Sequence, residues 1–241
     1  MNRPAKVILA TLLFSLCAAS ARADLIIGLP PDADTGNQFP FGGGYNGEYQ
    51  QVYTSSQFSG PITITDLEFF NTQFDSGVTS LNSGTWTISL STTSVDWNTI
   101  GPTFASNLGG DNTVVFTGNL GQPWAFGDTL SIILNTPFTY NPANGNLLMD
   151  VLVTQTPSGT RVFFDTNGSN GGALNGNTIM GRDFCPGGIS CGTSGTVNHG
   201  YGLVTGFSTG AAPAPEPATL LLFATGLLIG IGRTIKNKVR A

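Results

Sequence analysis

The sequence has 241 residues, of which only 10% are charged, against about 25% in ordinary soluble domains. Within residues 24–217 only Arg161 and Arg182 are basic, and all fourteen acidic residues lie there, so two positive charges stand against fourteen negative ones, a net −12. Such a charge repels phosphate backbones and argues against nucleic acid as a partner, and 40% hydrophobic residues argue against a disordered chain.

Residues 1–23 have the three parts of a secretory signal peptide. Two basic residues precede an apolar stretch that we expect to be helical, and Ala21 and Ala23 frame a small-x-small cleavage site. Signal peptidase is therefore an expected partner, and Asp24 the expected first residue of the mature chain. A lipoprotein signal at Cys17 is the alternative, but a bulky leucine precedes this cysteine where a lipobox has a small residue.

Residues 24–210 alternate between short strand-like segments and turn-forming Gly, Asn and Asp. We expect strands at 25–29, 61–70, 85–92, 113–117, 129–134, 146–154, 161–164 and 202–207. No segment outside the two termini has the 3.6-residue periodicity of an amphipathic helix. This pattern predicts one all-β domain, an antiparallel β-sandwich of jelly-roll-like arrangement.

Alternation within the expected strands indicates which side chains face the core. Trp86, Ile88 and Leu90 alternate with Thr and Ser and should point inward. Around Asp66 the apolar parity shifts, which predicts a β-bulge or bend. The segment 146–154 is nearly all apolar, so we expect a central strand that is covered on both faces.

Cys185 and Cys191 are the only cysteines left once the signal peptide is removed. An even number of cysteines in an exported protein favours a disulfide. Metal binding is the alternative, but the chain has a single histidine, His199, and a four-ligand zinc site would lack a partner.

The residues Asp165, Asn167 and Asn170 resemble the opening of a calcium loop. The twelfth position is Gly176, which cannot supply the bidentate carboxylate of an EF-hand. A second acidic turn is expected at 32–37. Calcium is therefore a weak candidate cofactor, and Asx-turns that cap their own backbone are the alternative.

Several aromatic residues fall in segments that read as loops: Tyr45, Tyr49, Tyr53, Trp97, Trp124 and Tyr201. Of these, Trp97, Trp124 and Tyr201 are candidate sugar contacts, because flat aromatic rings beside Asn and Asp suit sugar recognition. Thr-rich outer faces, with Thr63, Thr65 and Thr87, leave ice binding as a variant of this hypothesis.

Catalytic patterns are weak in this chain, and we expect that it is not an enzyme. A lone histidine excludes two-histidine metal sites, and neither a Gly-x-Ser-x-Gly elbow nor a Gly-rich phosphate loop precedes a helix. Glu48 and Glu68, together with the aspartates, would be the carboxylates of a glycoside hydrolase, which remains an alternative.

The C-terminus has three parts in a fixed order: a Pro/Ala linker at 211–217, an apolar stretch at 218–235 and a basic tail at 236–241. Sixteen uncharged residues separate Glu216 from Arg233, or about 24 Å of helix, a little less than the ~20 residues that usually span a bilayer. We expect a transmembrane helix at 218–235. The basic residues, which the positive-inside rule keeps cytoplasmic, are Arg233, Lys236, Lys238 and Arg240.

This order resembles the PEP-CTERM sorting signal of exopolysaccharide-producing bacteria with a two-membrane envelope. The match consists of Pro215, Glu216 and Pro217, the apolar stretch and the basic residues from Arg233. The resemblance implies that exosortase, a membrane transpeptidase, cuts near the motif and releases or re-anchors the protein outside. An uncut tail anchor is the alternative. Fragments within 127–151 and 202–205 also look like domains often found before such tails, which implies a sandwich of unassigned role.

We therefore expect an exported protein with a structural or adhesive role in an exopolysaccharide matrix or biofilm. The precursor would be anchored in the inner membrane, and the mature form would lie on the cell surface or outside the cell. A carbohydrate-binding module is the first alternative, in which extracellular polysaccharide is the direct partner.

Overall fold

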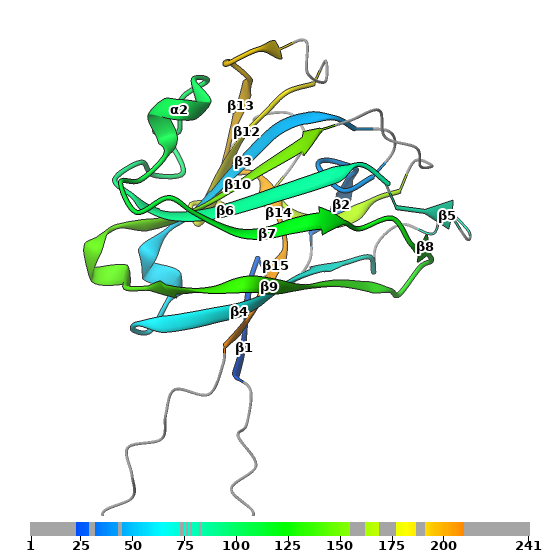
Figure 1. Ribbon diagram of the computed structural model, residues 1–241, viewed down its shortest axis with the longest axis horizontal. Helices are drawn as coiled ribbons and strands as arrows, with labels where there is room; N and C mark the ends of the chain where they lie inside the picture. Colours follow the sequence, from blue (N-terminus) through cyan, green and yellow to red (C-terminus); the bar gives the residue numbers. More distant parts are fainter. Residues whose placement is uncertain are drawn as a thin grey trace, which may run out of the picture. The chain divides into compact units, whose positions relative to one another are not determined.

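The computed structural model describes residues 23–28, 32–42, 45–72, 75, 77, 79–81, 83–154, 162–168, 177–186 and 191–209. Ala23–Gly210 is one compact unit, close to the expected domain of 24–210. Its elements are shown in Figure 1. The strands are β1 (Ala23–Ile27), β2 (Asp32–Asn37), β3 (Gly47–Tyr53), β4 (Ile62–Phe70), β5 (Thr79–Ser80), β6 (Thr85–Thr93), β7 (Thr113–Asn119), β8 (Pro123–Trp124), β9 (Thr129–Tyr140), β10 (Asn146–Thr154), β11 (Phe164–Asn167), β12 (Met180–Phe184), β13 (Thr196–His199), β14 (Gly202–Leu203) and β15 (Thr205–Thr209). The short helices are η1 (Ser55–Gln57), α2 (Phe104–Asn107) and η2 (Pro142–Asn144).

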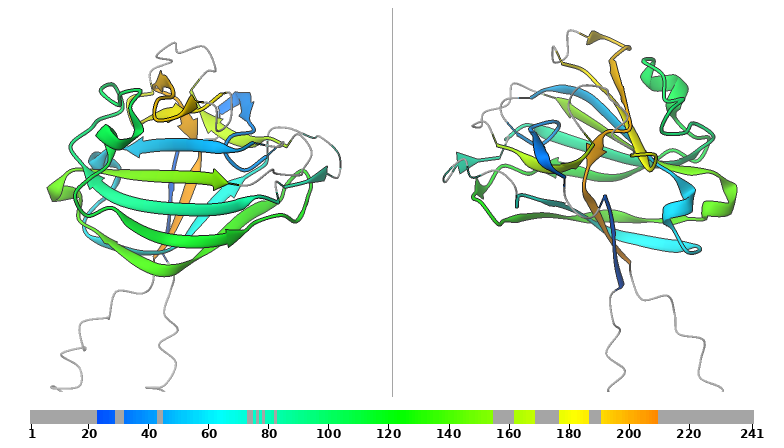
Figure 2. Two further views of the ribbon diagram at one scale, coloured as in Figure 1. Left: turned by 45° about the horizontal axis from the view of Figure 1, so that its top comes forward. Right: turned by 180° about the vertical axis from the view of Figure 1, so that it is seen from behind.

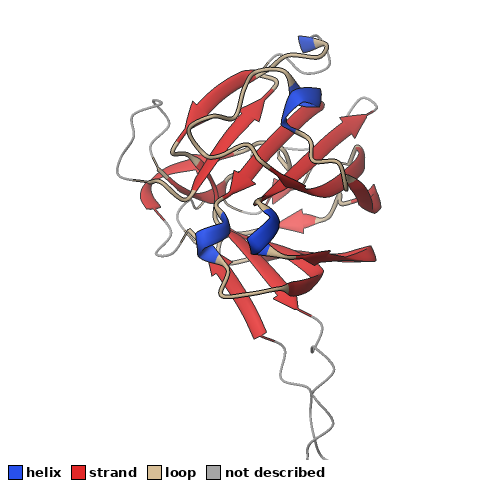
Figure 3. Ribbon diagram, turned by 90° about the vertical axis from the view of Figure 1, so that its left-hand side faces the viewer, coloured by secondary structure: helices blue, strands red, loops and turns tan. Residues whose placement is uncertain are grey.

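Two antiparallel sheets make up most of the domain. One has the order β1-β15-β4-β9 and the other the order β13-β12-β3-β10-β6-β7 (Figure 2). Smaller sheets, β14-β11-β2 and β5-β8, lie beside them. Strands dominate the described residues, and each helix is a single short turn (Figure 3). The prediction of an all-β, sandwich-like domain with antiparallel strands is confirmed.

The hydrophobic core joins the two large sheets. Phe41 packs against Trp86 of the six-stranded sheet, with ring centroids 5.1 Å apart, and against Phe69 of the four-stranded sheet, at 4.5 Å. Tyr53 and Phe207, also from opposite sheets, meet edge to face at 5.1 Å. These aromatic contacts add to the apolar area that the sheets bury against each other.

The alternation of the strands was predicted well where apolar and polar residues separate cleanly. Trp86, Ile88 and Leu90 are fully buried. The register of β4 against β9 shifts between Ile64 and Asp66, at the position where the parity of the sequence changes. Strand β10 lies in the middle of its sheet, between β3 and β6, as its apolar composition predicted.

The outer face of the six-stranded sheet is covered by the segment that connects β6 to β7 and contains α2. Val52, Ile100 and Leu148 form a second small hydrophobic cluster under this segment. Leu148 faces this cluster while Met149 faces the main core, so β10 is covered on both faces near Leu148. The expected cover does not extend along the whole strand, since Leu152 is 38% exposed. The cover also buries Ser89 and Ser91, which had been expected to face solvent.

Several strands were not predicted from the sequence. Strands β3, β12 and β13 were missed, β2 was read as an acidic turn, and β11 begins at Phe164 rather than ending there. In β3 the aromatic residues that had been assigned to loops are buried in the sheet. Gln51 shows why this strand is hard to recognise: its amide is buried but satisfied, donating to Leu203 O at 2.9 Å and accepting from Leu203 N at 2.7 Å.

The expected signal peptide, linker, transmembrane helix and basic tail lie outside the described residues, except for Ala23 at the start of β1. Within the part of the chain that the structure describes, no helix is both long and apolar enough to cross a membrane.

Candidate functional site around strand β12

Strand β12 places opposite charges on its two faces. It pairs with β3 on one side and β13 on the other, so Asp183 lies across from Gln50, and Arg182 across from Gln51 and Asn198. Successive side chains of a strand point to opposite faces. Asp183 therefore faces the cover that contains α2, whereas Arg182 shares the core face with Gln51.

Three carboxyl groups, those of Glu48, Asp150 and Asp183, form an acidic cluster on the covered face. Asp150 and Asp183 lie directly across from Gln50, from β10 and β12 respectively, and Glu48 is two residues before Gln50 on β3. Gln50 is fully buried and Asp183 is 0% exposed. The cluster therefore crosses three adjacent strands of one sheet.

The cover is attached to this cluster by side-chain amides. Gln50 Nε2 donates to Asp150 Oδ1 at 3.0 Å and to Phe104 O at 3.1 Å. Asn107 Nδ2 donates to Gln50 Oε1 at 2.9 Å and to Gly101 O at 2.8 Å. These bonds connect the sheet directly to α2, so the buried amides of the cluster are satisfied by the cover.

Burial and mutual repulsion keep protons on these carboxyl groups. Burial, together with the charge of Asp150, raises the pKa of Glu48 to about 8, and burial raises the pKa of Asp150. A hydrogen bond joins Glu48 to Asp150, so ionisation of one carboxyl group disfavours ionisation of the other. Burial also raises the pKa of Asp183 to about 7, opposed only by the nearby backbone amide of Phe184.

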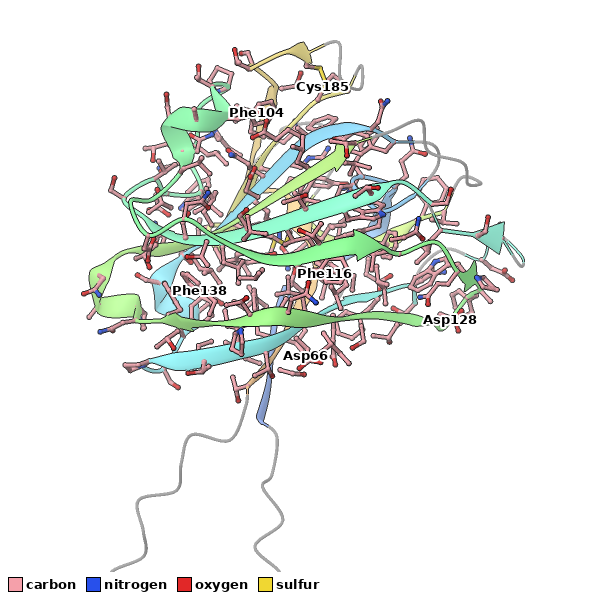
Figure 4. The ribbon with its side chains drawn as sticks, viewed as in Figure 1. Asp66, Phe104, Phe116, Asp128, Phe138 and Cys185 are labelled. Atoms are coloured by element: carbon pink, nitrogen blue, oxygen red, sulfur yellow. A yellow bond between two sulfur atoms is a disulfide. The ribbon has the colours of Figure 1, made fainter. Side chains whose placement is uncertain are left out.

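The surrounding protein provides few polar contacts to the carboxyl group of Asp183. Neither of its carboxyl oxygens has a well-formed hydrogen bond. Its carboxyl group packs against Gly195, where an added Cβ would overlap Asp183 Oδ1 and the ring of Phe104. Figure 4 shows Phe104 on α2 and Cys185, just after β12, toward the same end of the domain. The charged form of Asp183 is therefore disfavoured in this position.

The core face of β12 carries a second cluster, which we call the Arg182 cage: Tyr49, Arg182, Phe184, Asn198 and Tyr201. The guanidinium carbon of Arg182 lies 4.1 Å from the ring centroid of Phe184 and 4.3 Å from that of Tyr201. Arg182 Nε donates to Asn198 Oδ1 at 3.0 Å, and Tyr49 accepts a further hydrogen bond from the guanidinium. Two buried polar atoms of the cage have no hydrogen-bond partner among the described residues, Arg182 Nη1 and the Tyr201 hydroxyl.

The predicted disulfide is confirmed. Cys185 and Cys191 are bonded, with Cα atoms 5.6 Å apart. Cys185 is buried and directly follows β12, and its backbone amide donates to Glu48 O at 2.9 Å. The bond therefore fixes the end of the strand that carries both clusters.

Of the candidate calcium residues, Asp165 and Asn167 lie in strand β11. Asp165 is a buried strand residue whose carboxylate accepts from Thr72 N at 2.8 Å and from Thr72 Oγ1 at 2.7 Å. Asn170 lies outside the described residues, and 32–37 forms strand β2 rather than an acidic turn. Among the described residues, no group of three His, Cys, Asp or Glu side chains is arranged to hold a metal ion.

The candidate sugar contacts do not form a platform. Trp124 is 2% and Tyr201 1% exposed, because their rings pack into the interior, and only Trp97 is partly exposed. The Thr array proposed for ice binding is also divided, since Thr63 and Thr65 lie in one large sheet and Thr87 in the other. Burial thus removes two of the three aromatic candidates.

The two glutamates named for the alternative of a glycoside hydrolase do not pair with each other. Glu48 and Glu68 belong to different sheets. Glu48 instead forms a hydrogen bond with Asp150, which is closer than the ~5–9.5 Å that separates the two carboxyl groups of glycosidases.

Sequence reasoning missed both clusters on β12. One feature of the sequence could have indicated them. Arg182 is one of only two lysines or arginines in 24–217, and it stands next to an aspartate in a segment of mixed polarity. Comparison with protein-family models and with curated proteins finds no match for this chain.

Proposed function

We propose that this chain is an exported protein that an exosortase-type transpeptidase sorts through its C-terminal PEP-CTERM signal. Its β-domain has a structural or adhesive role within an extracellular polysaccharide matrix, and no catalytic activity is part of the proposal. The observation that carries it is the order of Pro215-Glu216-Pro217, an apolar stretch and a basic tail, behind a domain that follows a signal peptide.

The positions of the domain's two ends support this proposal. Strands β1 and β15 are paired, with Ala23 opposite Thr209. The sites at which the two processed segments join the domain are therefore neighbours on one sheet. The β1–β15 ladder forms between residues within the domain, so its hydrogen bonds do not require either segment.

The disulfide supports the proposed location of the mature form, on the cell surface or outside the cell. Disulfides persist in oxidising compartments and are rare in the cytosol. The Cys185–Cys191 bond involves the only two cysteines beyond residue 23. The precursor is proposed to be held in the inner membrane by 218–235, with the basic residues on the cytoplasmic side.

We also infer that the domain is a jelly roll. The eight strands β1, β3, β4, β6, β7, β9, β10 and β15 can be counted in chain order as first to eighth. One sheet then reads first, eighth, third, sixth, and the other reads second, seventh, fourth, fifth. This order is that of two interleaved Greek keys. Strands β12 and β13 extend the second sheet beyond β3.

Replacement of the sorting motif tests the proposal without disturbing the domain. We expect a chain with Pro215→Ala, Glu216→Ala and Pro217→Ala to accumulate as an unprocessed membrane-bound form in the producing cells. A matched control, Thr209→Ala at the end of β15, should be processed normally. Normal release of the triple variant would contradict the proposed role of the motif.

A further inference from the structure

Arg182 is a buried cation without a carboxylate partner among the described residues. It is 2% exposed, and the groups that contact its guanidinium are two aromatic rings, the Asn198 amide and the Tyr49 hydroxyl. The nearest carboxylate in sequence, Asp183, projects from the other face of β12. The acidic cluster is therefore separated from this charge by the sheet itself.

A buried charge needs compensation beyond that provided by the rings. Stacking against Phe184 and Tyr201 gives cation–π attraction, but an isolated charge in a poorly polarisable interior remains strongly disfavoured. Burial accordingly lowers the pKa of Arg182, and the neighbouring tyrosines only partly oppose this shift. An anion at the guanidinium would supply the missing opposite charge.

The cage offers hydrogen-bond donors that suit an anion. Arg182 Nη1 is buried and has no acceptor, and the hydroxyl of Tyr201, on one of the stacked rings, also has no partner. Both groups can donate, and arginine cannot accept a hydrogen bond. Buried donors without acceptors are rare in folded proteins and call for a bound group.

We propose that the Arg182 cage binds one small monovalent anion, to which Arg182 Nη1 and the Tyr201 hydroxyl donate. The near-complete burial of Arg182 and Tyr201 excludes a polymer chain or a bulky polyvalent ion. The aromatic walls favour an anion that sheds its water readily. The site is independent of the sorting proposal, since it lies within the folded domain and would act as an anionic brace between β12 and the Gly200–Tyr201 turn.

Thermal melting of the purified domain at constant ionic strength and pH 7 tests the proposal. Sodium bromide and sodium acetate supply compact anions, and sodium gluconate supplies a bulky one. We expect a saturable rise in melting temperature with bromide or acetate relative to gluconate, and the two arms distinguish a halide from a carboxylate. Tyr201→Phe, which keeps the ring and removes one donor, should weaken the apparent anion affinity several-fold.

The second variant changes Asn198 instead of Arg182, because substitution of a buried arginine can prevent folding. Asn198→Asp places a carboxylate where the Arg182 Nε hydrogen bond is made. It should raise the melting temperature in gluconate and abolish the response to bromide. Asn144→Asp, which adds the same charge at an exposed position, should respond as the unmodified protein does.

Diffraction gives an independent readout. Crystals soaked in bromide should show an anomalous peak within hydrogen-bond distance of Arg182 Nη1. Equal melting curves in bromide, acetate and gluconate, or a water molecule alone at this position in the bromide-soaked crystals, would overturn the proposal. A bromide response in Asn198→Asp equal to that of the unmodified protein would do the same.

Discussion

The carboxyl group of Asp183 shows how a single residue ties the stability of this domain to pH. The group is buried and its pKa is raised from 3.8 to about 7, and that of Glu48 is raised from 4.5 to about 8. Between about pH 4 and pH 8 the folded protein therefore binds more protons than the unfolded chain. The contribution of these two groups to stability therefore falls as the pH rises through this window, the opposite of the usual behaviour of salt-bridged carboxylates.

We expect Asp183→Asn to raise the melting temperature at pH 8, because the variant removes a buried negative charge. A rise of about 2–4 °C corresponds to ~1 kcal/mol for a domain of this size. At pH 5, where the native carboxyl group is protonated, the gain should disappear. Differential scanning calorimetry from pH 5 to pH 9 measures both effects.

Asp75→Asn is the matched control for this prediction. Asp75 is exposed, and its side-chain oxygen accepts from Gly77 N at 2.9 Å, a bond that asparagine retains. The control should leave the pH profile unchanged. If Asp183→Asn left the slope of stability against pH as steep as in the unmodified protein, Asp183 would not carry the proposed charge penalty.

Gly181 is a residue at which the cover approaches the sheet too closely for a side chain. A Cβ at this position would overlap the backbone oxygen of Trp97, whereas one at Gly110 would meet nothing within 4 Å. We expect Gly181→Ala to cost about 1–3 kcal/mol in the free energy of unfolding, measured by urea titration. Gly110→Ala should change it by less than about 0.5 kcal/mol. Equal effects of the two substitutions would mean that the cover is not packed on β12.

At the scale of elements, the disulfide fixes the end of β12. Removing it with Cys185→Ala and Cys191→Ala should lower the free energy of unfolding by about 2 kcal/mol. This is the contribution expected when a short loop restricts the conformational entropy of the unfolded chain. The sequence separation is 6 residues. Reduction of the unmodified protein should produce a similar loss, and the double variant should be insensitive to reductant. A double variant as stable as the oxidised protein would show that the loop is held by other contacts.

Elements could be predicted where hydrophobicity alone sets the strand. The alternation of Trp86, Ile88 and Leu90 with small polar residues identified β6, and the parity change near Asp66 identified the bulge. The signal peptide and the C-terminal sorting signal stay predictions, because they rest on composition and order and lie outside the described residues.

Strands β3 and β12 could not be predicted because buried polar residues interrupt their apolar pattern. Gln50, Gln51, Arg182 and Asp183 are all at most 2% exposed. Gln51 is satisfied by Leu203, 152 residues away, and Gln50 by Asp150, 100 residues away. The local sequence does not indicate such distant partners, so the segments that contain these polar residues are typical of loops. The two clusters on β12 depend on this pairing and were missed with it.

At the scale of the whole molecule, the domain is acidic and free of lysine, and its first and last strands are paired. Residues 24–217 contain fourteen acidic residues and two arginines, which gives a net charge of −12. The other lysines and arginines of the chain lie in the two terminal segments that are proposed to be removed. Pairing of Ala23 with Thr209 places the first and last described residues of the domain on neighbouring strands. The folded domain is therefore suited to exist both as a tethered precursor and as a released or re-anchored mature form.

Intact-mass analysis of the protein from producing cells, with and without their exosortase, tests the central claim most directly. We expect a mature form that begins at Asp24, has lost residues 218–241 and is recovered on the cell surface or in the medium. In cells without exosortase, the chain should extend from Asp24 to Ala241 and remain in the inner membrane. The same mass and the same location in both strains would contradict the account.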